Sequence, residues 1–553
     1  MNKKCKKVFK IISTENGKVV TVSLKRMLRY IFKLYKQQGG TIDKVMNYEF
    51  KICCDGRQIL NKNQVALATI PLSMEDIFKT QEVLSVFYFG LMEMDETKEN
   101  VIKYFTSVFK EQIEDIEKNG IVVDDEKVNV FFTYVSDLKN CGQVMDTDCL
   151  CCKKKMSEQT HSNVFVINHD YYGEDKKSEF GIKYTNHVFC TLHMKQRIHE
   201  RLIAYMAGLL DDSDFEKITN NIRGIKCCGD FHWREKKSKH VTSLDAEGYE
   251  TDRTLFIPNQ IRDGAIDVML NNIDTIFEGI TSNRVNDCKV LLQLWRNIVC
   301  HFQATNDEIR SDSNFYNTLN VSVKLFLALF ARIFPNKSMR SPYLHLLTHL
   351  EYYIKKFGSL ARYSNQGFEN SHKYHKTLLG RISNNGGSAT KISNVEFIMY
   401  WQCRKMLTCI GSNSKWGSLV KHREEKVSTT EATEDATQKK VTKKELSALN
   451  YTRFVKENWS VPSEQVQVII QRLEQAQQPQ QPQQPQQPQQ PQQPQQPQPQ
   501  QQSQQSQQQP KSRGRPKNQQ PQQSQPQNQV SKRKYSDPNV VIPQGASNKK
   551  TKK

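Results

Sequence analysis

Residues 127–137 read KVNVFFTYVSD, a nearly unbroken apolar run that ends in an aspartate. Such a run predicts a strand that is buried on both faces. A helix is expected just before it, because apolar side chains in residues 97–120 recur three and four residues apart and Gly120 follows as a stop signal. The stretch therefore predicts an α/β unit in which a buried strand follows a helix.

Three more strands are expected upstream of this helix. They are YEFKICCDG (48–56), QVALATIPLS (64–73) and EVLSVFYFGLM (82–92), which alternate or are rich in β-branched and aromatic residues. The first is expected to run into a turn at Asp55-Gly56. The predicted order is three strands, a helix and a fourth strand, with Asp55 at the end of the first strand and Asp137 at the end of the fourth.

Two carboxylates on neighbouring strand ends suit metal-dependent phosphodiester chemistry. Mg²⁺ is a hard cation that prefers oxygen ligands, and a pair of such ions activates a water or 3′-hydroxyl and stabilises the leaving oxygen. Each aspartate alone also suits a structural role, with Asp55 opening an Asp-Gly turn and Asp137 capping the segment after its strand.

Cysteines and histidines supply a second possible metal site. The motifs are Cys149-x₂-Cys152, Cys190-x₂-His193 at the start of an amphipathic helix, and His345-x₃-His349, whose i,i+4 spacing places both rings on one helix face. Two thiolates and two imidazoles complete a tetrahedral zinc site. Cys149, Cys152, Cys190 and His193 form a rival set, and Cys151 can replace either neighbouring cysteine.

The order of these motifs, followed by Glu369 in SNQGFENSHKYH (364–375), resembles the order found in a known family. The family is the eukaryotic cut-and-paste DDE transposases with an RNase H-like core, in the Transib, Kolobok and hAT-like group, which is related to the catalytic subunit of the V(D)J recombinase. The likeness covers residues of about 45–410. Each motif is short, so the specificity lies in their order.

The resemblance implies roles for individual residues. Asp55, Asp137 and Glu369 would bind Mg²⁺ or Mn²⁺ as catalytic carboxylates, and His193 would lie close to them. Structural zinc would be bound by Cys149, Cys152, His345 and His349. Lys373 and Lys376 would face DNA phosphates. Glu369 also suits a plain role as a first-turn glutamate favoured by the helix dipole.

The expected fold is an α/β RNase H-like catalytic core that is interrupted by a largely α-helical insertion. Four amphipathic runs between residues 195 and 340 predict the insertion, and Trp295, Phe326 and Phe330 are expected in its core. The expected domains are a basic N-terminal segment (1–44), the first part of the core (45–140), the zinc-linked insertion (141–340), the last part of the core (341–410), a charged helical or linker region (411–470) and the tail (471–553).

The tail is expected to be disordered, because its Gln/Pro-rich composition lacks apolar groups to bury. Residues 511–553 contain 11 Lys or Arg and one Asp, about half of the net charge of +21 of the whole chain. The motif KSRGRPK (511–517) resembles an AT-hook, in which Arg513 and Arg515 would enter a narrow A·T-rich minor groove. SKRK (531–534) and KKTKK (549–553) suit nuclear import. A polyanion is the expected partner.

The N-terminal residues predict no signal peptide, and no run of 18 apolar residues predicts a membrane span. The 14 cysteines are then expected to be reduced or metal-bound. We expect a nuclear, Mg²⁺-dependent DNA transposase, acting as a homodimer on transposon ends, that cleaves and transfers DNA strands. The 54 residues before Asp55 show no site-specific DNA reader, which the family usually has, so a catalytically inactive nuclear DNA-binding protein is the alternative. A nuclease of the same fold is a third.

Overall fold

The computed structural model describes residues 1–59, 61–161, 170–235, 256–383, 392–412, 449 and 451–457, and the statements below concern these residues. Chain contacts divide the protein into two units, Met1–Pro479 and Gln480–Lys553. The second unit, with the AT-hook-like motif of Arg513 and Arg515, lies outside the described residues, as does most of the predicted 411–470 region.

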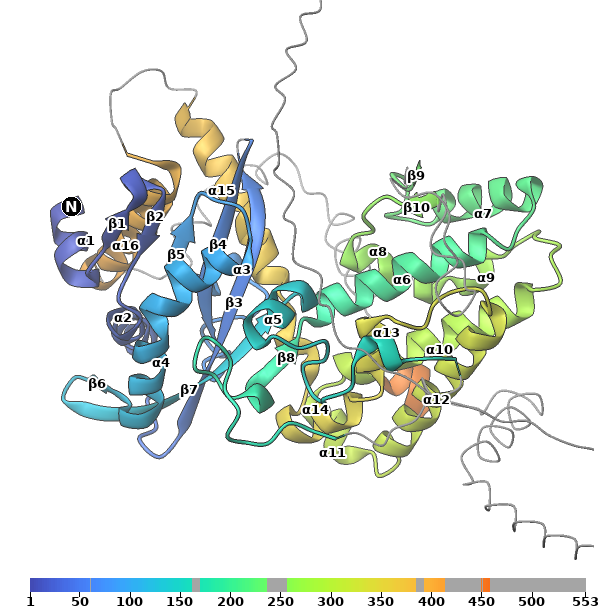
Figure 1. The fold of residues 1–553 in the computed structure, drawn as a ribbon, viewed down its shortest axis with the longest axis horizontal. Helices are drawn as coiled ribbons and strands as arrows, with labels where there is room; N and C mark the ends of the chain where they lie inside the picture. Colours follow the sequence, from blue (N-terminus) through green and yellow to red (C-terminus); the bar gives the residue numbers. More distant parts are fainter. Residues whose placement is uncertain are drawn as a thin grey trace, which may run out of the picture. The chain divides into compact units, whose positions relative to one another are not determined.

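The first unit is a mixed α/β structure built on a mixed sheet of eight strands (Figure 1). The order is β1-β2-β5-β4-β3-β7-β6, and β8 also pairs with β7. β3, β4 and β5 are antiparallel neighbours, whereas β7 runs parallel to β3 and β8 parallel to β7. The strands are β1 (Ile12–Thr14), β2 (Val19–Thr21), β3 (Asn47–Ile59), β4 (Lys62–Pro71), β5 (Phe87–Met92), β6 (Ile121–Val123), β7 (Glu126–Ser136) and β8 (His187–Phe189).

The predicted turn at Asp55-Gly56 is wrong, because β3 continues to Ile59. The antiparallel ladder with β4 extends past Asp55, which is paired with Ala66, whereas the parallel ladder with β7 ends at Ile52. Gly56 is needed for close approach instead of for a turn. A Cβ there would lie 2.8 Å from an Oε2 atom of Glu96.

The helix predicted over 97–120 is present, in three parts that end at Gly120 with φ 69°. They are α3 (Lys98–Val101), the π-helical η3 (Ile102–Thr106) and α4 (Ser107–Asn119). The third predicted strand is shorter than expected, because Val83–Ser85 form the 3-10 helix η2 and β5 begins only at Phe87.

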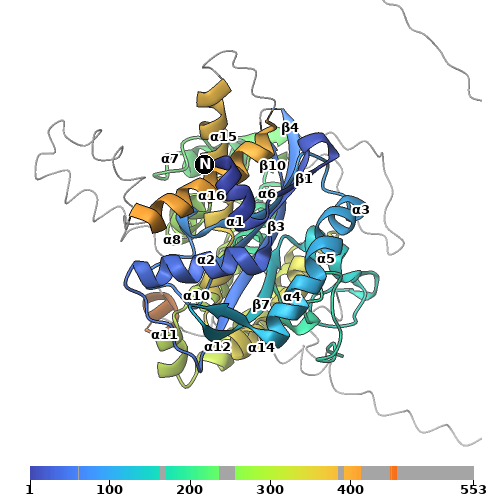
Figure 2. The ribbon, with the colours of Figure 1, turned by 90° about the vertical axis from the view of Figure 1, so that its left-hand side faces the viewer.

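Residues before β3 form part of the same sheet and its cover. β1 and β2 extend the sheet beyond β5. α2 packs against β5 and β6, α4 against β7, and α16 against β5 and β2, while α1 contacts α16 and α2 (Figure 2). These helices are α1 (Asn2–Phe9), α2 (Leu24–Gln37) and α16 (Asn394–Ser412).

A largely helical region follows β8, and its buried apolar side chains join those of the sheet in one continuous core. Trp295, Phe326 and Phe330 are buried, as predicted, where α10 packs on α12. Its helices are α6 (Thr191–Ala207), α7 (Asp212–Gly224), α8 (Asp263–Asn271), α9 (Ile273–Ile276), α10 (Val285–Gln303), α11 (Asn306–Ser311) and α12 (Phe315–Ile333), with a hairpin of β9 (Trp233–Glu235) and β10 (Phe256–Pro258).

The single helix predicted to carry His345 and His349 is instead divided into α13 (Pro342–Leu347) and α14 (Leu350–Phe357). The Thr348 hydroxyl donates to the His345 carbonyl at 2.7 Å, and the His349 amide donates to the Leu346 carbonyl at 3.0 Å. This tightened turn ends the first helix, and His349 becomes the N-cap of the second. Among the described residues, every helix is too short or too polar to cross a membrane.

Candidate metal centres

Asp55 and Glu369 are brought together although they are far apart in the sequence. Single ligand atoms of Asp55, Glu369 and His372 all lie within 4.8 Å of one another. Asp55 extends from β3, and Glu369 lies in the first turn of α15 (Gln366–Ser383). The Nε2 atom of His193, from α6, lies 3.6 Å from Oε1 of Glu369. The Nδ1 atom of His372 lies 3.6 Å from Oε2 of the same carboxylate. The site therefore joins β3, α6 and α15.

The pKa values of the two carboxyl groups are shifted in opposite directions. Burial, and then the charge of Glu369, raises the pKa of Asp55 well above its ordinary value. Burial also raises the pKa of Glu369, but hydrogen bonds from His193 and His372 outweigh it, so its net pKa shift is downward. Ionising both carboxyl groups at this distance is costly, and a divalent cation between them would offset that cost.

Asp137 lies near this pair but outside the group. It is the N-cap of α5 (Leu138–Met145), where its Oδ1 atom accepts a hydrogen bond of 2.7 Å from the Asn140 amide. The structural role considered for Asp137 is therefore present. Its charge also contributes to the raised pKa of Asp55, after burial and Glu369.

The sequence analysis did not identify Glu96, a half-buried carboxylate near Asp137. Its Oε1 atom accepts from the Asn140 side-chain amide at 2.9 Å, and its Oε2 atom is 3.6 Å from the Lys139 ammonium. Burial, and then the charge of Asp137, raises the pKa of Glu96. The surrounding MDETKEN (94–100) has no periodic pattern that would mark a site residue, although Gly56 opposite it signals a close backbone approach.

Cys190 and His193 belong to the carboxylate site, and the structure does not join them to Cys149 and Cys152. Burial raises the pKa of the Cys190 thiol, but His193 outweighs burial and the net pKa shift is downward. Burial lowers the pKa of His193, whereas Cys190 and Glu369 raise it well above its ordinary value. Their mutual charge interaction therefore favours a thiolate and an imidazolium, next to Glu369.

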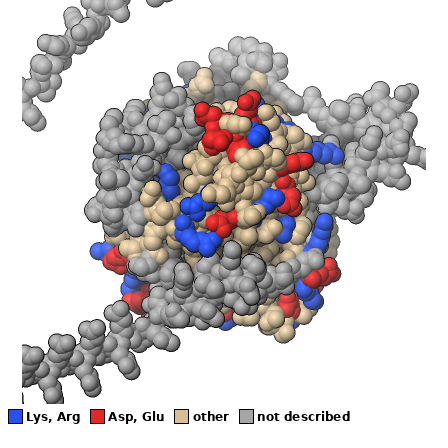
Figure 3. Space-filling view, turned by 90° about the vertical axis from the view of Figure 1, so that its right-hand side faces the viewer, with Lys and Arg blue, Asp and Glu red and all other residues tan. Residues whose placement is uncertain are grey.

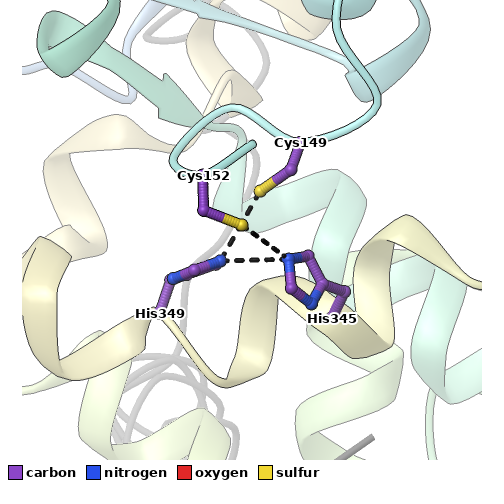
Figure 4. Close-up of side chains that lie close together, drawn as sticks. All are labelled: Cys149, Cys152, His345 and His349. Atoms are coloured by element: carbon purple, nitrogen blue, oxygen red, sulfur yellow. Dashed lines mark hydrogen bonds between the residues drawn. The ribbon is translucent and has the colours of Figure 1, made fainter. Parts of the chain in front are cut away.

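A second centre is formed by Cys149, Cys152, His345 and His349 (Figure 4). One ligand atom from each lies within 4.8 Å of the other three, and all four residues are buried. The Cys152 sulfur is 3.2 Å from Nε2 of His345, and the Cys149 sulfur is 3.5 Å from Nε2 of His349. These four side chains could hold a metal ion.

The cysteines of this centre come from the loop after α5, and the histidines from α13 and the N-cap of α14. The Cys151 amide donates to the Cys149 sulfur at 3.4 Å, whereas the Cys151 thiol is associated with Tyr353. A hydrogen bond with Cys152, then burial and the charge of Cys152, raise the pKa of the Cys149 thiol. A soft cation would remove that penalty, because thiolates are its preferred ligands.

Basic side chains lie on the helix of Glu369 and around Asp137. Lys373 and Lys376 are exposed on α15, the helix of Glu369. A cavity of about 720 Å³ borders Asp137, and its lining includes Lys98, Lys139 and Arg197.

No protein-family model matches the chain, and no curated protein is significantly similar to it.

Proposed function

We propose that this chain is a DDE-type DNA transposase or recombinase, which hydrolyses phosphodiester bonds and transfers DNA strands with two Mg²⁺ or Mn²⁺ ions. The observation that carries the proposal is the convergence of Asp55 and Glu369 on one site. Asp137 at the end of the neighbouring parallel strand supplies the third carboxylate of the proposed set.

The strand order supports an RNase H-like core. Three antiparallel strands (β5, β4 and β3) are followed across the sheet by β7 and β8, which run parallel to β3, and a helix connects β5 to β7. Along the chain, three strands, a helix and a further long strand follow in the order predicted from the sequence, with the short β6 before β7. The helices α6 to α12 fall within the expected insertion, 141–340.

Asp55, Asp137 and Glu369 would hold the ions, with Glu96 nearby. When bound, the ions would activate the attacking hydroxyl and neutralise charge on the leaving oxygen. In this proposal His193 and His372 would orient the Glu369 carboxylate, because each has a ring nitrogen 3.6 Å from one of its oxygens.

We further propose that the Cys₂His₂ centre binds structural zinc. Two sulfurs and two imidazole nitrogens are the ligand set that favours tetrahedral Zn²⁺ over Mg²⁺ or Ca²⁺. The ion would tie the loop after α5 to α13 and α14, and so hold the helical region against the sheet.

The proposed partner is double-stranded DNA, bound in the nucleus by a homodimer on transposon ends. Lys373 and Lys376 would contact phosphates beside the carboxylates. The basic tail, with Arg513 and Arg515, would add A·T-preferring affinity. On the face drawn in Figure 3, described Lys and Arg side chains are interspersed with Asp and Glu, so that face does not present a uniformly basic surface.

The test is a nicking and strand-transfer assay on supercoiled DNA with Mg²⁺ or Mn²⁺. Asp55→Asn, Asp137→Asn and Glu369→Gln are each expected to abolish cleavage and to leave folding and DNA binding intact. Asp274→Asn, at a carboxylate that is 86% exposed in the helical region, is the matched control and is expected to cleave normally. Equal cleavage by wild type and the three site variants would reject this active site.

A second candidate function is DNA binding without chemistry, by a transposon-derived protein that keeps the fold. The use of Asp137 as a helix cap favours it, because only two of the three carboxylates then lie in one group. A folded wild type that binds DNA but cleaves no substrate would support this candidate.

A further inference from the structure

We propose that Asn365 is a positioning residue that fixes Glu369 relative to Asp55, Asp137 and His193. The inference rests on the proposed metal-dependent function and identifies how the chain sets the geometry of that site. Asn365 lies immediately before α15 and is 1% exposed.

The polar groups of Asn365 reach three other parts of the chain. Its side-chain oxygen accepts from the Cys53 thiol at 3.3 Å, and its side-chain amide donates to the Val135 carbonyl at 3.2 Å. Its backbone amide donates to the Cys190 sulfur at 3.4 Å. The Asn365 carbonyl accepts from the Glu369 amide at 2.9 Å, which begins the helix.

Each partner is a short step from a site residue. Cys53 is two residues before Asp55 in β3 and therefore lies on the same face of the strand. Val135 is two residues before Asp137, at the end of β7. Cys190 is the N-cap of α6, one turn before His193. Asn365 thus contacts every segment that brings a residue to the proposed site.

Lys51 strengthens the same attachment. Its side chain is fully buried, and its ammonium donates to the carbonyls of Ser364 at 2.8 Å and Arg362 at 3.2 Å. Lys51, Cys53 and Asp55 are two residues apart along β3, so their side chains lie on the same face of the strand. The backbone just before α15 is therefore held by two successive residues of the face that also bears Asp55.

A buried polar network of this kind is costly unless every group is paired, and an apolar side chain could pack a helix end at less cost. Its use here is to specify position. Groups that orient metal ligands typically change metal affinity 10–100-fold when they are removed, and small displacements of reacting groups also lower rates strongly.

The test uses the full-length, zinc-loaded chain and Mn²⁺ as the probe, with free Mn²⁺ measured by electron paramagnetic resonance. The quantity compared is the Mn²⁺ affinity that is lost in Asp55→Asn and Glu369→Gln. Asn365→Ala is expected to weaken this carboxylate-dependent Mn²⁺ affinity about tenfold, with zinc content unchanged. Saturating Mn²⁺ should restore much of the cleavage rate, as expected for misplaced ligands and not for missing ones.

Asn259→Ala is the matched control. Asn259 is also buried, and its side chain makes two hydrogen bonds to backbone, with the His232 amide at 3.1 Å and the Asp230 carbonyl at 2.9 Å. It is expected to leave Mn²⁺ affinity unchanged. Cys53→Ala removes the bond from the β3 side and should reproduce part of the loss. The loss of Mn²⁺ binding free energy in the double variant Asn365→Ala/Cys53→Ala should be smaller than the sum of the losses in the two single variants.

The outcomes separate the two proposals. If the wild type binds Mn²⁺ through Asp55 and Glu369, and folded Asn365→Ala binds it equally well, the positioning role is rejected and the proposed function stands. If Asn365→Ala does not fold, Cys53→Ala decides, and unchanged Mn²⁺ affinity in it rejects the role. If the wild type shows no Mn²⁺ binding that depends on the carboxylates, both proposals are rejected.

Discussion

Burial and the charge of Glu369 raise the pKa of Asp55 in the folded protein. Asp55 therefore loses its proton at a higher pH in the folded protein than in the unfolded chain. For a carboxyl with a raised pKa, the folded state is favoured below the unfolded pKa, and that stability is lost as pH rises through the folded pKa. Each unit of pKa difference corresponds to about 1.4 kcal/mol. The Asp55 carboxyl is therefore expected to reduce stability at neutral pH when no cation is present, whereas the lowered pKa of Glu369 acts in the opposite direction.

Asp55→Asn is then expected to raise the free energy of unfolding at pH 7 in buffers without Mg²⁺, and to raise it less near pH 4. Urea unfolding across this pH range, with zinc left in place, measures the effect. Millimolar Mn²⁺ should reverse the order, since only the wild type gains from binding the cation. A variant that is less stable than wild type at pH 7 and equally so at pH 4 would contradict the electrostatic account.

Residue order in the chain was sufficient to propose the Asp, Cys, His and Glu residues, because each occurs in a short motif with chemical meaning. The close grouping of Cys149, Cys152, His345 and His349 was among the predictions and is confirmed as a possible metal site. Glu96 and Asn365 could not be found in this way. Their roles depend on contacts with distant strands, and neither has a local pattern.

At the scale of elements, the break between α13 and α14 places His349 at a helix N-cap beside His345. Replacing either histidine by Ala should release about one zinc per chain and lower stability by several kcal/mol, because ligand loss is folding loss in such sites. Metal analysis of the purified protein and thermal unfolding measure both effects.

His301→Ala provides the control for this prediction. His301 is also fully buried, and it bonds the Asn297 carbonyl and the Thr318 hydroxyl. Its loss should lower stability but leave zinc bound. Well-folded wild type without zinc, or His345→Ala with full zinc content, would reject the zinc assignment.

Two glycines of α15 give a test of how closely this helix is packed. A Cβ on Gly367 would lie 2.8 Å from the Thr80 carbonyl oxygen, whereas a Cβ on Gly380 would meet nothing within 4 Å. Gly367→Ala should therefore destabilise the protein by about 1–3 kcal/mol and weaken carboxylate-dependent Mn²⁺ binding. Gly380→Ala should be neutral or stabilising by up to about 1 kcal/mol. Equal unfolding free energies for the two variants would show that the helix is not held at Thr80.

Periodic patterns predicted the long elements well, and local chemistry explains the errors. β3, β4, β7 and the four helical runs are long and patterned. β8 has only three residues, too few to show alternation, and exists because β7 offers it an edge. The turn expected at Asp55-Gly56 was wrong because β4 continues the ladder, so tertiary pairing overrode a local turn signal.

For the molecule as a whole, the proposed DNA affinity is divided between the folded part and the tail. Deleting residues 511–517 should weaken binding to A·T-rich duplexes more than to G·C-rich ones, because Arg513 and Arg515 would read minor-groove width. Lys373→Ala/Lys376→Ala should instead weaken both equally and reduce the salt dependence of log K by about 2. Fluorescence anisotropy at several salt concentrations measures both.

Deleting residues 549–553 is the control for the tail, since it removes four lysines without the Arg-Gly-Arg-Pro core. It should lower affinity for both duplexes alike. If the 511–517 deletion also lowers the affinity for A·T-rich and G·C-rich duplexes equally, this segment binds DNA as a general polycation. The folded part could be predicted in outline from sequence, whereas the tail, which lies outside the described residues, stays a prediction.

The long helical region lies between β8 and α15 in the chain, so the residues of the carboxylate site are made at very different times. On the ribosome, Asp55 and Asp137 emerge early, while Glu369 follows only after the whole helical region has been synthesised. At roughly 5–20 residues per second, this delay is on the order of tens of seconds. A nascent chain that stalls before α15 lacks Glu369, and one that stalls before α13 also lacks His345 and His349. Translation therefore completes the proposed cleavage site only after the helical region, and products that end before Glu369 cannot contain it.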